Sequence, residues 1–418
     1  MDEKGGRTID FRAVLLEALP PGTAATVSSV EQLKERLARR NRRRRRTGGT
    51  LGVLAVVVPL LVVALVPFRG SGHEPARGAG TVPVPTGTAY CVLVTTAGGS
   101  IERIAFGASS TDATTSGSTP PVLQKALIGG LPGAGAIAVS RATDTAYVAS
   151  RHGDHDTLTP VDLNDATVGR PIGLGAHAPG PLAISPDGRT AYVLTGGLDD
   201  TVLVVDLQRR AVTDSISVGP LPSAIALSPD GSTAYVSSWI SARGGSPVPG
   251  QVAVIDLATD TVTAHVTVGV GPEGVATSPD GRLVFVSNSV SDTVTAVSTA
   301  TDAAVATIGV GHVPKAVAVD PSGHEAYVVD SGQNYPGPNA VTPIRTATLS
   351  ASAPVPVAPY SSQIAMAPDG RTAFVLGGTL GGAVVVPVDL TTDTAGNAVA
   401  LGPVSVDQVV GLAAAPVP

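Results

Sequence analysis

The sequence predicts an all-β repeat protein, and three observations support this prediction. An aromatic residue within a short apolar strand recurs at spacings of 57, 45, 43, 50, 42 and 47 residues. These aromatic positions are Tyr90, Tyr147, Tyr192, Tyr235, Phe285, Tyr327 and Phe374. Five of them follow a Pro-Asp-Gly or Pro-Ser-Gly turn, which suits a type I turn between adjacent strands. Apolar residues make up 43% of the chain but aromatic residues only 3%, so the core must consist of Val, Ala, Ile and Leu, as in tightly packed sheets.

Each repeat divides into four short strands. In the repeat that contains Tyr235, we expect an inner strand over 223–228, a second over 234–237, a third over 251–256 and an outer one over 261–268. A period of about 40–50 residues with several strands is typical of the blades of a β-propeller. In several repeats the third strand ends in Val/Ile-Asp-Leu, and we expect this aspartate to cap the next turn rather than to act in catalysis. These aspartates are Asp162, Asp206, Asp256 and Asp389.

The two ends of the repeat region complete each other. Six of the aromatic strands have an inner strand before them, whereas Tyr90 has none. Residues 406–412 form an inner strand with no partner after it. Pairing these two ends would complete one blade and leave no open sheet edge. The sequence therefore predicts a seven-bladed β-propeller over 87–418, closed by one shared blade.

The repeats also contain a tetrapeptide that is typical of one family. It occurs as Tyr147-Val-Ala-Ser, Tyr192-Val-Leu-Thr, Tyr235-Val-Ser-Ser and Phe285-Val-Ser-Asn. In these residues the sequence resembles the YVTN-repeat, YncE-like β-propellers found on or outside bacterial and archaeal cells, over about residues 88–418. The resemblance implies the fold, but it says little about function because one propeller fold supports many chemistries.

A membrane anchor is expected before the propeller. Residues 47–68 contain an uncharged apolar run long enough to cross a bilayer as a single transmembrane helix. Residues 1–46 carry a net charge of +6 and end in an arginine cluster, whereas 47–418 carry −12. The excess of arginine before the span places 1–46 in the cytoplasm and the propeller outside. Residues 69–86 form a Gly/Pro-rich linker. A cleaved signal peptide is the alternative.

The cytoplasmic segment 1–46 is expected to be helical. Asp10 begins one short amphipathic segment, and Ser28 with Glu31 has the spacing of a capping box for a second. This basic segment either only sets the topology or also docks a cytoplasmic partner or anionic lipid.

Long connections between second and third strands are the candidate partner-binding loops. They lie on the face that also carries the links between blades, and loops enlarged on one face mark a binding face. The candidate residues are His152, Asp154, His155, Asp156, Trp239, Arg243, Asn334 and Tyr335. The His/Asp group is expected to be a solvated loop, with a divalent metal as the alternative, and Trp239 either anchors a partner or packs over its own blade. On the opposite face, the Pro-Asp-Gly turns are expected to be too tight to shape a pocket.

The mouth of the central channel is the second candidate site, for a small ligand. Aligned inner strands place mostly Gly and Ser at this level, together with three charged residues. The candidate ligand-binding residues are Glu273, Lys315, Asp407, Ser223 and Ser362. Glu273 and Lys315 come from consecutive blades and could instead simply pair with each other.

The sequence contains no motif for a cofactor, a metal or a catalytic nucleophile. Its single cysteine excludes an intramolecular disulfide and a cysteine-based structural zinc site. The net charge of −12 over 47–418 disfavours nucleic-acid binding, which needs Lys and Arg for phosphate contacts. We therefore expect a membrane-anchored, non-enzymatic binding or scaffold module for a protein, a cell-wall polymer or a small ligand. The alternatives are a propeller hydrolase of lactonase type and a sensor that signals through 1–46.

Overall fold

The computed structural model describes residues 88–96, 98–107, 122–151, 155–196, 200–240, 247–332, 339–379, 382–401 and 409–416. The expected cytoplasmic segment 1–46, transmembrane helix 47–68 and linker 69–86 lie outside these residues. Within the described ranges, no helix has both the length and the apolar character needed to cross a membrane.

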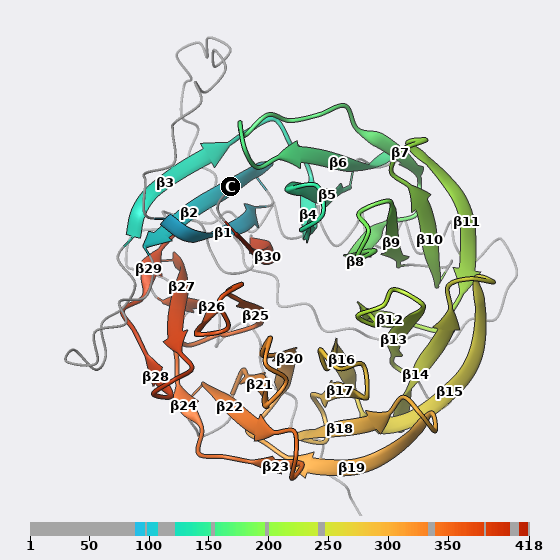
Figure 1. Cartoon of the computed structure of the whole chain (residues 1–418), viewed down its shortest axis with the longest axis vertical. Coiled ribbons are helices and arrows are strands. Elements are labelled where there is room, and N and C mark those ends of the chain that lie inside the picture. The colour runs from blue at the N-terminus through green and yellow to red at the C-terminus, as the bar shows by residue number, and fades with distance from the viewer. Residues whose placement is uncertain are drawn as a thin grey trace, which may run out of the picture. The chain divides into compact units, whose positions relative to one another are not determined.

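The described strands form seven sheets that surround a common centre (Figure 1). Six sheets consist of strands that follow one another in the chain, and we call them blades 1 to 6. Blade 1 contains β4 (Ala134–Ser140), β5 (Thr145–Ser150), β6 (Asp156–Asp162) and β7 (Ile172–Gly175). Blade 2 contains β8 (Pro179–Ile184), β9 (Thr190–Thr195), β10 (Thr201–Asp206) and β11 (Ala211–Ser217). Blade 3 contains β12 (Pro222–Leu227), β13 (Thr233–Ser238), β14 (Pro249–Asp256) and β15 (Thr261–Val270).

The remaining blades repeat this order from the centre outward. Blade 4 contains β16 (Pro272–Thr277), β17 (Leu283–Asn288), β18 (Thr293–Ser298) and β19 (Ala303–Gly309). Blade 5 contains β20 (Pro314–Val319), β21 (Glu325–Asp330), β22 (Ala340–Arg345), β23 (Ser350–Ala351) and β24 (Val355–Pro356). Blade 6 contains β25 (Gln363–Met366), β26 (Thr372–Thr379), β27 (Gly382–Asp389), β28 (Thr394–Ala395) and β29 (Val399–Ala400).

The seventh sheet, which we call the terminal sheet, joins both ends of the described chain. It contains β1 (Thr88–Thr96), β2 (Ser100–Gly107), β3 (Val122–Ile128) and β30 (Val409–Pro416). β30 pairs antiparallel with β1, from Tyr90 opposite Pro416 to Thr96 opposite Val409. Figure 1 shows β30 on the inner side of β1, in the position that an inner strand holds in the other blades.

The core lies between neighbouring sheets and consists mainly of Val, Ala, Ile and Leu. The second strands are buried along most of their length, because sheets cover them on both faces. The repeated aromatic residues of the second strands in blades 1 to 6 are all buried. Phe106 of the terminal sheet meets Phe374 of blade 6 with ring centroids 4.6 Å apart. The prediction of an all-β propeller is confirmed.

In blades 2, 3 and 4 a Ser-Pro-Asp-Gly turn connects the inner strand to the second strand, and blades 5 and 6 have the related turns Asp-Pro-Ser-Gly and Ala-Pro-Asp-Gly. In blade 3, the Ser228 hydroxyl donates a hydrogen bond to Asp230, and the Gly231 amide donates to the Ser228 carbonyl at 2.9 Å. Gly231 has φ +72°, and a side chain there would lie 2.8 Å from Pro186 in the preceding blade. Glycine is therefore required both by the backbone conformation and by the contact between blades.

The Val/Ile-Asp-Leu aspartates cap turns, as predicted. Asp206 accepts hydrogen bonds from the backbone amides of Gln208 and Arg209, and Asp256 accepts them from Ala258 and Thr259. Asp162 and Asp389 make the equivalent bond to the residue two positions on. These carboxylates stabilise the turn between third and outer strands.

Candidate functional site

The two faces of the ring differ in what they display. One face, the turn face, carries the Pro-Asp-Gly turns. The opposite face, the loop face, carries the connections between second and third strands and the links between blades. Backbone hydrogen bonds join these two kinds of segment, from Trp239 to the Leu221 carbonyl and from Ser331 to the Val313 carbonyl, each at 3.1 Å. The expectation that the long connections and the links share a face agrees with these bonds.

A residue with left-handed backbone occurs in each of the six links that lead into blades 1 to 6. Its φ lies between +49° and +70° and it precedes or nearly precedes the inner strand. These residues are Gly133, Ala178, Leu221, Gly271, Val313 and Tyr360. Glycine adopts this conformation at little cost, whereas Leu, Tyr and above all β-branched Val adopt it rarely. Four of the six links therefore carry a side chain where glycine would be less strained.

Three of these strained residues are held by a carboxylate from the preceding blade. Asp156 accepts a hydrogen bond from the Ala178 amide at 2.8 Å, Asp200 from Leu221 at 3.2 Å and Asp292 from Val313 at 2.9 Å. Asp156 is 1% exposed, so it is a structural clamp, which corrects the expectation that it meets a partner. His155 is exposed, and His152 and Asp154 lie outside the described residues.

Trp239 lies half-buried on the loop face, where blade 3 meets the link to blade 4. A side chain on Gly271 would lie 3.1 Å from the Trp239 ring and 2.7 Å from Val290, so both side chains flank this glycine. The ring thus packs against the link into the next blade rather than only over its own blade. The other candidate loop residues, Arg243, Asn334 and Tyr335, lie outside the described residues.

Four exposed apolar side chains lie on the loop face. Leu221, Ile240, Val290 and Tyr360 are 53%, 37%, 50% and 54% exposed and all belong to links or to connections on this face. The other large apolar side chains that are exposed in the described ranges, Val168 and Val305, lie toward the outer edges of blades 1 and 4.

The charged groups at the channel mouth neutralise each other. Lys315 donates a hydrogen bond to Glu273 at 2.7 Å, and both side chains are about three-quarters buried. The Ser223 hydroxyl bonds to Ser237 and, at 2.7 Å, to the Pro272 carbonyl of the next blade. Ser362 is half-buried and donates its backbone amide to Leu376. Asp407 lies outside the described residues.

One buried carboxyl group on the loop-face end of a second strand was not predicted. Asp330 ends the second strand of blade 5, is 1% exposed, and accepts a hydrogen bond from Thr342, while its Oδ1 atom has no partner. Burial raises the pKa of Asp330 to about 6, against the opposing effect of the Thr342 hydroxyl. Blade 4 has Asn288 at the equivalent position. The sequence signal for this site is therefore the charged Asp330 in blade 5, where the preceding blade has a neutral Asn288.

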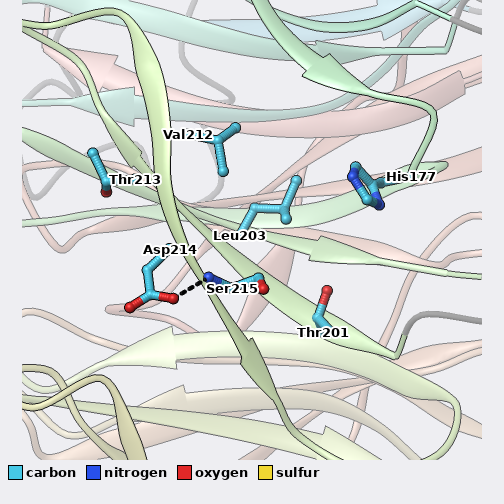
Figure 2. A pocket seen from close by; sticks show the side chains of 7 residues that line it. All are labelled: His177, Thr201, Leu203, Val212, Thr213, Asp214 and Ser215. Carbon is cyan, nitrogen blue, oxygen red and sulfur yellow. Dashed lines mark hydrogen bonds between the residues drawn. The ribbon is translucent and has the colours of Figure 1, made fainter.

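Two hollows lie outside the channel. A groove of about 420 Å³ lies beside the outer strands of blade 2 (Figure 2). Its lining residues are His177, Thr201, Leu203, Val212, Thr213, Asp214 and Ser215. A second hollow of about 650 Å³ lies on the turn face and includes Asp280, Arg282 and Val305. This second hollow corrects the expectation that the turn face is too tight to shape a pocket.

Comparisons with known proteins agree with this architecture. Residues 177–321, about a third of the chain, match the family model described as "Lactonase, 7-bladed beta-propeller". The chain is a β-propeller. No protein with a curated description matches it. Its fold is similar to that of a hydrazine synthase from Kuenenia stuttgartiensis, with 24% identity, a TM-score of 0.53, and coverage of 66% of this chain and 80% of that one. It is also similar to a functionally unknown protein from Desulfotomaculum acetoxidans, with 16% identity, a TM-score of 0.58, and coverage of 79% and 99%. At these identities the likeness shows the fold alone.

Proposed function

We propose that this propeller is a non-enzymatic binding module whose loop face receives a partner. The observation that carries the proposal is the presence on that face of four exposed apolar side chains, Leu221, Ile240, Val290 and Tyr360. Two of them, Leu221 and Tyr360, occupy left-handed backbone positions where glycine costs less. Strain that is kept at exposed positions favours a role in binding over a role in folding.

The channel mouth supports binding over catalysis. Among the described inner strands, the charged side chains are Glu273 and Lys315, and each is already the partner of the other. A hydrolase needs a free base or nucleophile within reach of its substrate. From the sequence, Asp407 is expected at the channel mouth as a third charged residue. We therefore propose the binding of a small polar ligand at the mouth as a second function of the loop face.

The cellular setting is part of the proposal. Residues 47–68 form a single transmembrane helix, 1–46 lie in the cytoplasm, and the propeller is held outside the membrane by the linker 69–86. The ring counts seven blades of the YVTN-repeat, YncE-like kind, and the terminal sheet is the blade that both chain ends share. Pairing of β1 with β30 and the seven-bladed family match support this count.

Lactone hydrolysis is the second candidate function, because residues 177–321 match a family named for lactonases. If the chain were such an enzyme, Glu273 and Lys315 would be the groups available for acid–base work in the described channel. Hydrolysis of a sugar lactone by the full chain, lost in Glu273→Gln, would establish this alternative.

Site-specific photo-crosslinking in cells tests the proposed function. A photoreactive amino acid at position 240 should give a discrete adduct, whereas the same group at position 305, on the outer strand of blade 4, should not. Both positions are exposed, so accessibility does not separate them. Adducts that form at 305 but not at 240 would contradict the proposal.

A further inference from the structure

Four apolar residues of the loop face belong to the links and connections on either side of blade 3. We call them the apolar shelf and define it as Leu221, Trp239, Ile240 and Val290. Trp239 and Val290 flank Gly271 directly, and the Trp239 amide donates a hydrogen bond to the Leu221 carbonyl at 3.1 Å. Ile240 follows Trp239 in the chain. Three of the four side chains are 37% to 53% exposed, and Trp239 is half-buried.

Glycine between Trp239 and Val290 is required by space. Gly271 has φ +70°, and a Cβ atom there would lie 2.7 Å from Val290. A larger residue would therefore displace the side chains that form the shelf. Leu221, at the equivalent position of the preceding link, also has a left-handed backbone and is 53% exposed.

Carboxylates lie beside the shelf. The Asp200 carboxylate accepts a hydrogen bond from the Leu221 amide, and Asp292 follows Val290 by two positions and accepts one from the Val313 amide. Asp292 also bonds to His312, whereas Glu273 at the channel mouth is neutralised by Lys315. Residues 47–418 as a whole carry −12. Opposite charge favours association and like charge suppresses it, so an anionic lipid surface or polyanionic wall polymer is disfavoured.

We infer that the apolar shelf binds a protein segment that combines apolar side chains with lysine or arginine. This inference rests on the proposed function and specifies its partner. An aromatic anchor at the centre of a patch, with apolar neighbours that exclude water, is the arrangement of a binding hot spot. The carboxylates beside it attract the cationic residues of the segment and set its orientation.

Trp239 is the only tryptophan of the chain, so its fluorescence reports on the shelf alone. The experiment uses the full chain in uncharged detergent and a short peptide of leucine and lysine as the probe. We expect a saturable shift of the Trp239 emission to shorter wavelength, weakened by added salt. Ile240→Ser and Val290→Ser should each raise the Kd about tenfold. Val305→Ser, a matched exposed valine on the outer strand of blade 4, should leave the Kd unchanged.

Two further probes separate this inference from the proposed function. The same peptide with glutamate in place of lysine should not bind, and an equal Kd for both peptides overturns the charge argument. The second probe is an uncharged N-acetylglucosamine oligomer. If it shifts the Trp239 emission and the leucine–lysine peptide does not, the inference is overturned. The proposal that the loop face is a binding module then still stands. Wild-type affinity in Ile240→Ser and Val290→Ser shows that the peptide binds elsewhere and also overturns the inference.

Discussion

Protonation of Asp330 is expected to make the stability of the propeller depend on pH. The folded state raises the pKa of this carboxyl group to about 6 from an ordinary value of 3.8, because burial disfavours the charged form. Above pH 6 the folded protein holds a buried carboxylate with one unpartnered oxygen atom. The unfolded chain releases the same proton near pH 4. Between these values folding takes up a proton, so stability falls as the pH rises.

The size of this effect follows from the two pKa values. The full difference corresponds to about 3 kcal/mol, which is present below pH 4 and lost once the pH exceeds 6. Between pH 4 and pH 7 the expected loss is about 2 kcal/mol, because part of the titration of the unfolded chain lies below pH 4. Such a value is a large fraction of the stability of a typical domain.

Asp330→Asn is the informative variant because blade 4 already uses asparagine at this position. Asn288 is fully buried, donates to Thr295 at 3.0 Å, and lies against Gly269 as Asp330 lies against Gly311. The amide of the variant can donate to Thr342 in the same way. We therefore expect Asp330→Asn to fold and to lose the pH dependence that this carboxyl group contributes.

The assay is chemical unfolding of the full chain in uncharged detergent at pH 4, 5, 6 and 7. Wild type should lose about 2 kcal/mol more than Asp330→Asn across this range. Thr342→Val removes the hydroxyl group that opposes the pKa shift, so the fall in stability should extend to higher pH. Equal pH dependence in wild type and Asp330→Asn would refute the reasoning.

Four further predictions concern stability, closure and topology. Leu221→Gly relieves the strain of a left-handed backbone, so thermal unfolding should show equal stability or a gain of up to about 1 kcal/mol. A loss above about 1 kcal/mol would show that Leu221 stabilises the fold. Burial and the nearby Asp214 and Asp256 raise the pKa of Asp260, so Asp260→Asn should raise stability more at pH 7 than at pH 4. Unchanged stability at both pH 7 and pH 4 would contradict this. Deletion of 406–418 removes β30 and exposes the edge of β1, so the truncated chain should aggregate or unfold at a Tm well below that of wild type. An unchanged Tm would contradict the closure of the ring by β1 and β30. Protease added to intact spheroplasts should digest the propeller and spare an N-terminal tag, and protection of the propeller would reverse the topology.

The strands were predictable because their signals are local. In blade 3 the expected inner and outer strands differ from β12 and β15 by at most two residues at each end. Turn chemistry and alternating burial act within a few residues of each other, so a repeat reveals them. The Val/Ile-Asp-Leu aspartates were assigned correctly for the same reason, since each caps a turn two residues away.

The site was less predictable because its interactions join distant parts of the chain. Asp156 looked like a loop residue, but it clamps Ala178 in the link to the next blade. The burial of Asp330 depends on a glycine that comes from the preceding link. The hollow on the turn face arises between two blades, each of which has an ordinary turn of its own. The pairing of Glu273 with Lys315 was considered in advance, because the two residues occupy the same level of consecutive inner strands.

The measurement that tests the central claim most directly is amide hydrogen exchange on the adduct captured at position 240, compared with the free chain. A partner on the loop face should slow exchange at Trp239 and Val290, whose amides hydrogen-bond to the neighbouring links, and leave the turn glycines Gly188, Gly231 and Gly281 unchanged. Slower exchange at these three turns, with Trp239 and Val290 unaffected, would place the partner on the turn face and contradict the account.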